Sequence, residues 1–334
     1  MKRTTLIFTS LIVITAVLFV IDLAVGSVSL PLSDVIAALM GGDCADTTRG
    51  IVCDIRLVKA VVALFAGWAL SVSGLQMQTL FRNPLAGPYV LGVSSGASLA
   101  VALFLIGAPL LGYSLSGQLS TIGIAAAAWA GSTMVLGIMA AASARIKDIM
   151  VILILGMMIA SGISAIVQIL QYLSSDNALK SFVIWTMGSL GNVTSEQLPL
   201  LAGAILAGLA VAIATIKPLN LLLLGEEYAL SLGINMRRSR MLVFLSTVLL
   251  AGTVTAFCGP IGFIGLAMPH VARMLFATAD HRVLLPGAAL TGGAVMLGCD
   301  VLSKSFTLPV NAVTALIGIP IVIWIVIRNK SMAV

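Results

Sequence analysis

The sequence is poor in charged residues. Only 9% of its 334 residues are Asp, Glu, Lys or Arg, whereas 60% are hydrophobic. A soluble domain carries about 25% charged residues, so this composition excludes an ordinary water-exposed surface. Apolar runs recur along the whole chain, and about 20 apolar residues in a helix cross a bilayer core. We therefore expect an all-α integral membrane protein that forms a single transmembrane domain over residues 1–334.

Signatures of nucleotide binding, metal binding and catalysis are also missing. No G-x-x-x-x-G-K-[ST] phosphate loop occurs, so ATP-Mg is not expected to bind this chain by that route. The two histidines are too few for a His-rich metal site, and no nucleophile–base cluster stands out. We expect no metal, no cofactor and no catalytic residue in this chain. The net charge of +6 forms no basic stripe, so nucleic acid is not an expected partner.

Hydropathy predicts about ten membrane spans, some of them short or broken by Gly and Pro. The first follows Lys2 and Arg3, and we interpret it as a retained span rather than a signal peptide, because no small-residue cleavage site follows it. The predicted spans cover residues 6–26, 57–80, 88–111, 119–143, 149–173, 194–216, 239–258, 261–277, 282–300 and 308–327.

The basic residues predict the orientation of these spans. With the N-terminus inside, 13 of the 18 Lys and Arg residues fall on the cytoplasmic side. Because basic residues favour cytoplasmic loops, both termini are expected in the cytoplasm of a multi-pass protein of the cell (inner) membrane. The five basic residues expected outside are Arg49, Arg56, Lys59, Lys180 and Lys304.

Charge within the spans is nearly absent. Asp22 and Asp300 come closest, and we interpret both as interfacial residues in contact with water near the outer ends of spans. Intramembrane carboxylates are typical of ion coupling, so their scarcity disfavours an ion-coupled secondary transporter, which remains the alternative class.

Seven ordered motifs give the chain a family resemblance. They are "DIRLVK" (54–59), "GWALSVSGLQMQTLFRNPLAGPYVLGVSSGA" (67–97), "WTMGSL" (185–190), "LGEEYALSLGI" (224–234), "GPIGFIGLAMPHVAR" (259–273), "HRVLLPGAALTGG" (281–293) and "LPVNAVTALIGIPIVIW" (308–324). From about residue 50 onward, the chain resembles the permease subunits of iron-siderophore, haem and cobalamin ABC importers. The resemblance implies the type II ABC importer fold and a homodimer with two ATP-binding cassette subunits inside and one substrate-binding protein outside.

A short cytoplasmic helix is predicted near residues 225–234. Glutamates at its start and a glycine at its end are suitable helix termini. The resemblance implies a coupling helix that docks on the ATPase subunit; a helix lying on lipid is the alternative. The candidate coupling residues are Gly225, Glu226, Glu227, Tyr228, Ala229, Leu232 and Gly233.

The resemblance also implies two further functional surfaces. Arg56, Lys59 and Lys304 match basic residues that contact acidic lobes of the binding protein, with lipid-headgroup anchoring as the alternative. Val58 stands where a proline is usual, which leaves the start of the second span uncertain. The cytoplasmic gate is expected at Asn83, Pro84 and Leu85, with a second constriction around residues 144–148.

The four cysteines fall into two pairs. Cys44 and Cys53 share a predicted outer loop, where the alternatives are a disulfide and two free thiols. Cys258 and Cys299 lie within predicted spans and are expected to pack there.

The substrate expected from the resemblance is a bulky metal chelate. "FRNPLA" and "CGPIGF" resemble the iron branch of the family and favour a ferric siderophore or haem. "DHRVLLPG" resembles the cobalamin branch equally well, so cobalamin is the alternative.

Overall fold

The computed structural model describes residues 2–26, 28, 30–107, 118–146 and 148–330, and every regular element in that part of the chain is helical. In order, the elements are α1 (Lys2–Ala24), α2 (Leu32–Met40), α3 (Asp46–Gly50), η1 (Ile51–Leu57), α4 (Val58–Leu80), α5 (Val93–Ala102), η2 (Leu103–Gly107), α7 (Gln118–Ser143), α8 (Ile149–Tyr172), α9 (Asp176–Thr186), η3 (Leu190–Asn192), α10 (Leu198–Ala214), α11 (Ile216–Leu222), α12 (Glu226–Ser231), α13 (Met236–Thr247), η4 (Val248–Gly252), α14 (Thr253–Cys258), α15 (Ile264–Phe276), α16 (His281–Phe306) and α17 (Val310–Lys330).

The predicted count of ten spans is not confirmed. Within the described residues, six helices are long and apolar enough to cross a membrane, or seven if the bent pair α10–α11 counts as one span. Each predicted span overlaps a helix, but the apolar helical segments at residues 93–107, 264–276 and 310–325 are shorter, at 10–17 residues. The end of the third predicted span, residues 108–111, lies outside the described residues.

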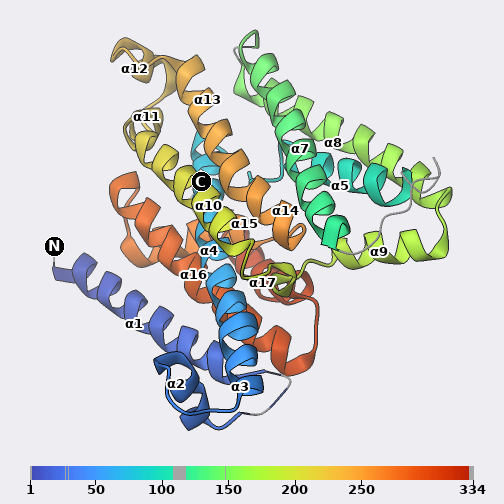
Figure 1. The fold of residues 1–334 in the computed structure, drawn as a ribbon. Coiled ribbons are helices and arrows are strands. Elements are labelled where there is room, and N and C mark those ends of the chain that lie inside the picture. Colours follow the sequence, from blue (N-terminus) through green and yellow to red (C-terminus); the bar gives the residue numbers. More distant parts are fainter. Residues whose placement is uncertain (1, 27, 29, 108–117, 147, 331–334) are drawn as a thin grey trace.

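Helix α4 runs through the centre of the fold, with α16, α15 and α10 packed around it (Figure 1). Small residues allow these backbones to approach closely. A Cβ atom added at Gly74 of α4 would lie 1.7 Å from the carbonyl oxygen of Gly265 in α15. One added at Gly292 of α16 would lie 2.4 Å from the carbonyl oxygen of Gly67 in α4. Glycine is therefore required at these positions, where two helices approach each other closely.

The start of the second span differs from the expectation. Helix α3 continues through the π-helix η1 into α4, giving 35 helical residues from Asp46 to Leu80. Val58 is the first residue of α4 and takes a helical conformation. Because valine keeps the backbone N–H that proline lacks, the chain can continue as a helix through this position.

The chain is also non-helical at residues 259–263, between α14 and α15, as the Gly-Pro content predicts. Gly259 has φ +75°, and Phe263 has φ +66°. The Gly262 N–H donates to Asn311 Oδ1 at 3.0 Å, and the Cys258 carbonyl accepts from the N–H of Ser189. Non-helical backbone at membrane depth needs such partners within the protein.

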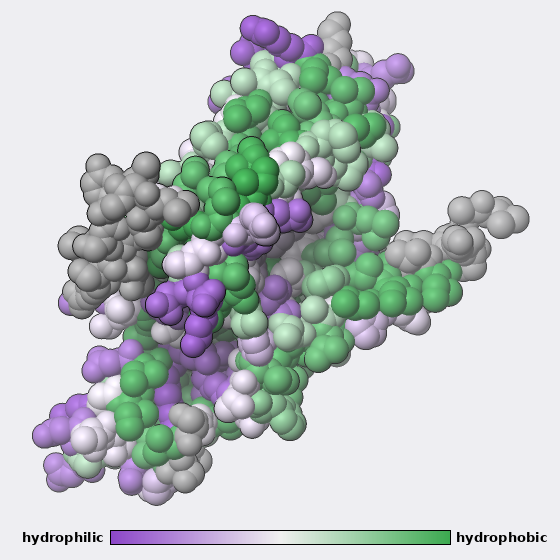
Figure 2. Space-filling model, turned by 90° about the vertical axis from the view of Figure 1, so that its right-hand side faces the viewer, coloured by the Kyte–Doolittle hydropathy of each residue, from purple (hydrophilic) through white to green (hydrophobic). Residues whose placement is uncertain are grey.

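Two sets of short helices lie at opposite ends of the molecule. In Figure 1, α12 is at the top and α2 and α3 are at the bottom, with the long helices between them. Figure 2 shows broad hydrophobic areas on one face, with hydrophilic residues at its upper and lower ends and in a patch between them. This distribution fits a protein whose middle zone contacts lipid.

Candidate coupling, gating and pathway surfaces

The predicted short helix is confirmed as α12. Gly225 precedes it with φ +119°, and Gly233 follows it with φ +82°, both in the region that favours glycine. Ala229 is fully buried, which anchors the helix to the fold. Tyr228 and Leu232 expose 52% and 53% of their surface, so half of each side chain is free for a partner.

A buried arginine joins α12 to the connection between α7 and α8. Arg240 of α13 is 3% exposed and forms an ion pair with Glu226 at 3.1 Å. Its Nη1 donates to the carbonyl of Ile146 at 3.1 Å. Beside this link lies a cavity of about 740 Å³ that borders α12, Arg82 and Asp148. Arg240 therefore links α12 to residues 144–148, the expected second constriction, in which Lys147 lies outside the described residues.

The predicted gate forms a tight turn after α4. Asn83 Oδ1 accepts a hydrogen bond from the backbone N–H of Leu85 at 2.9 Å. His270 of α15 contacts the Pro84 carbonyl at 2.7 Å through Nε2, which fixes the turn against α15. Leu85 is 48% exposed. Its apolar side chain is therefore available to narrow an opening, and the gating role stays a prediction.

The structure corrects the interpretation of Asp22 and Asp300. Both are fully buried rather than in contact with water. Lys304 lies 2.9 Å from Asp22 and 2.8 Å from Asp300, and Lys59 lies 3.0 Å from Asp300. Two lysines therefore balance two carboxylates, and the cluster joins α1, α4 and α16. Burying either aspartate without its lysine would carry a large desolvation cost.

The basic residues expected to meet a binding protein are thus engaged within the chain. Arg56 is 4% exposed and donates to the carbonyls of Leu23 and Ala24 at the end of α1 and to that of Val28 after it. The side chain of Lys304 is 8% exposed, and that of Lys59 is 20% exposed. Docking by these residues stays a prediction, with Lys59 the most accessible of the three.

Cys44 and Cys53 are free thiols in the structure, so the disulfide alternative is not formed. Cys53 Sγ lies 3.7 Å from the carbonyl of Ala38. Cys258 and Cys299 are buried, as expected.

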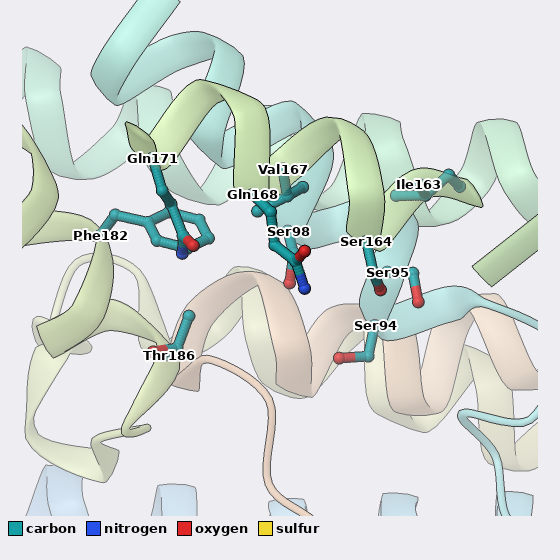
Figure 3. A pocket seen from close by; sticks show the side chains of 10 residues that line it. All are labelled: Ser94, Ser95, Ser98, Ile163, Ser164, Val167, Gln168, Gln171, Phe182 and Thr186. Carbon is teal, nitrogen blue, oxygen red and sulfur yellow. The ribbon is translucent and has the colours of Figure 1, made fainter. Parts of the chain in front are cut away.

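A polar groove lies between α5, α8 and α9 (Figure 3). Its volume is about 320 Å³. Seven of its ten lining residues carry a hydroxyl or an amide, and none carries a charge: Ser94, Ser95, Ser98, Ser164, Gln168, Gln171 and Thr186, with Ile163, Val167 and Phe182 between them. In Figure 3 the side chains of Gln168 and Gln171 extend from α8 toward the space bordered by Ser94 and Thr186.

Sequence reasoning missed this groove, although its signal is present. Ser164, Gln168 and Gln171 follow an i, i+4, i+7 spacing, which places them on one face of a helix. Such a polar stripe inside an apolar span is unfavourable against lipid and marks a face covered by water, protein or solute.

Comparison with known proteins decides the family. Residues 14–328 match the FecCD transport family. The chain belongs to this family. It is 36% identical over 320 residues to the hemin transport system permease protein HmuU of Yersinia pestis, covering 94% of each chain. It is 36% identical to the vitamin B12 import system permease protein BtuC of Klebsiella pneumoniae, over 83% of this chain and 82% of that one.

Solved structures agree with this membership. An inward-facing metal-chelate type ABC transporter superposes with a TM-score of 0.83 at 29% identity, covering 97% of this chain and 99% of that chain. PsaBC from Streptococcus pneumoniae, with a TM-score of 0.55 at 14% identity, shares the fold alone. The chain is thus a transmembrane ABC transporter permease with a type II importer fold, and the family's permease subunits are not catalytic.

Proposed function

We propose that this chain is the permease subunit of an ATP-driven importer that moves a bulky metal chelate into the cytoplasm by alternating access. The observation that carries the proposal is α12, which is anchored by Ala229 and exposes Tyr228 and Leu232. Arg240 connects this helix to the α7–α8 connection. An ATPase bound at α12 could therefore move a constriction without any nucleotide site in the permease.

The assembly proposed is a homodimer of this chain with two ATP-binding cassette subunits inside and one substrate-binding protein outside. Both termini lie in the cytoplasm and the complex sits in the cell (inner) membrane. Support comes from the distribution of basic residues and from family membership. The position of α12 at the end of the molecule opposite α2 and α3 agrees with this orientation.

The proposed cargo is a ferric siderophore or haem, with cobalamin as the alternative. The relatives named for haemin and for vitamin B12 are equally identical to this chain, at 36% each. The type of cargo common to all these alternatives is a large chelate that encloses its metal.

Proteoliposomes containing the permease, its ATPase and its binding protein test the proposal. We expect uptake of a radiolabelled chelate that needs both ATP and the binding protein. Replacing Tyr228 and Leu232 by Ala should abolish uptake and ATPase binding, whereas replacing Leu200, an exposed apolar residue of α10, should leave both unchanged. Uptake driven by an ion gradient without ATP would refute the proposal and favour a secondary transporter.

A further inference from the structure

The groove between α5, α8 and α9 is an unusual surface for a chain in which 60% of residues are hydrophobic. Along α8, exposed Met158, Ile166 and Ile169 suit contact with lipid or with apolar protein. Gln168 and Gln171 also lie on this helix but turn toward the serines of α5. The two kinds of side chain occupy different faces of one helix, so the polar face has a separate role.

Most polar groups of the groove have unused hydrogen-bonding capacity. Ser164 Oγ donates to the Ala160 carbonyl of its own helix, at 2.9 Å. In the described part of the chain, the side-chain amides of Gln168 and Gln171 and the hydroxyl of Ser98 make no hydrogen bond to protein. Unpaired amides are costly against hydrocarbon, so this face needs water, solute or another polar surface.

The groove provides donors and acceptors but no charge. Lys180 is the basic residue of α9, yet it does not line the groove. A ligand with ionised carboxylates would lose hydration here without gaining a cationic partner. A neutral ligand with amide, hydroxyl or hydroxamate groups could pair with Gln168 and Gln171, while Phe182 contacts its apolar parts.

We propose that this groove contacts the transported chelate and favours chelates with uncharged hydrogen-bonding groups over those with ionised carboxylates. Gln168 and Gln171 are its specificity-determining residues. The inference rests on the proposed function and narrows its cargo toward neutral hydroxamate or amide-bearing chelates, and away from haem with its two carboxylates. The alternative occupant is a second copy of the chain, which the experiment below separates.

Equilibrium dialysis on the permease–ATPase complex in lipid nanodiscs tests this choice without the selectivity of the binding protein. The probes are an iron-55 complex of a neutral trihydroxamate and haemin, with empty nanodiscs as the blank. We expect the neutral probe to bind more tightly than haemin. Removing two hydrogen bonds in a Gln168→Ala, Gln171→Ala variant should weaken binding of the neutral probe by about 5- to 150-fold.

Two further variants keep the test independent of folding. Ser161→Ala is the matched control, because Ser161 lies on α8 outside the groove and its hydroxyl donates to the Met157 carbonyl at 2.9 Å. It should bind both probes as the unaltered protein does. Gln168→Lys should strengthen haemin binding, a gain that misfolding cannot produce.

Several outcomes would overturn the inference. These are tighter binding of haemin than of the neutral probe, no binding of the neutral probe, or equal binding by the double variant and the unaltered protein. Dissociation of the double variant into single permease copies, measured by native mass spectrometry, would assign the groove to a subunit interface instead. None of these results would disprove the proposed function, which fails only if ATP-dependent uptake of every chelate is absent in proteoliposomes.

Discussion

Removing the amine of Lys304 should destabilise the protein strongly. This amine lies 2.9 Å from Asp22 and 2.8 Å from Asp300, and the lysine side chain is 8% exposed. A Lys304→Met substitution keeps most of the side-chain volume. It leaves Asp22, which has no other ion pair among the described residues, as a fully buried carboxylate without a cation.

The expected magnitude follows from that burial. Removing one partner of a buried ion pair lowers the free energy of unfolding by about 3–5 kcal/mol, because the remaining charge stays desolvated. At about 2 °C per kcal/mol for a chain of this size, the unfolding midpoint should fall by roughly 6–10 °C. Lys59→Met should cost less, since the Lys59 side chain is 20% exposed and Asp300 keeps Lys304.

The assay heats the protein in detergent and measures the fraction that stays monodisperse. The unfolding midpoint is the temperature at which this fraction has fallen to half. A Lys304→Met, Asp22→Asn double variant should recover much of the lost stability, because no uncompensated charge remains at Asp22. The reasoning is refuted if Lys304→Met alone leaves the midpoint unchanged, or if the double variant is less stable than the single one.

Three further predictions concern other parts of the chain. Gly292→Ala should prevent correct packing of α16 on α4, because the added Cβ would lie 1.8 Å from Ser71 Oγ. Gly298→Ala on the same helix is the control: its Cβ would meet nothing within 4 Å, so this variant should keep the unaltered midpoint in the same heating assay. Hydrogen bonds from the backbone N–H of Arg282 and from the Asn220 amide lower the pKa of Asp280. The stability that the Asp280 carboxylate contributes is therefore present at neutral pH and lost as pH falls below about 4. Asp280→Asn should make the unfolding midpoint less dependent on pH in that range. Cys44 and Cys53 should both react with a maleimide without prior reduction, and a reaction that requires reductant would contradict the free thiols of the structure.

Local sequence signals predicted α12 well but could not predict the charge cluster. The glycines and glutamates near α12 act within a few residues, so their pattern alone defines a short helix. Asp22 and Lys304 are separated by more than 280 positions, and only the packing of α1 against α16 brings them together. Hydropathy placed both near a span end, where contact with water is the usual state of a charged residue.

The predicted number of spans is not confirmed for a related reason. Hydropathy registers an apolar segment but not how many of its residues form one straight helix. Residues 88–92 precede α5 as a turn, with φ +82° at Gly92, so the third predicted span loses helical length at its start. The polar stripe of α8 was missed because its apolar neighbours dominate the average over the span.

The charge cluster also bears on the class of transporter. A buried aspartate is ordinarily a sign of ion coupling, because a carboxylate with no fixed partner can bind a proton or a metal cation. Here each buried aspartate is already neutralised by a lysine in the chain, so a transported cation would have to displace Lys59 or Lys304. The cluster therefore serves to join α1, α4 and α16. The driving force for transport is better sought at α12, where Arg240 connects an exposed helix to the interior.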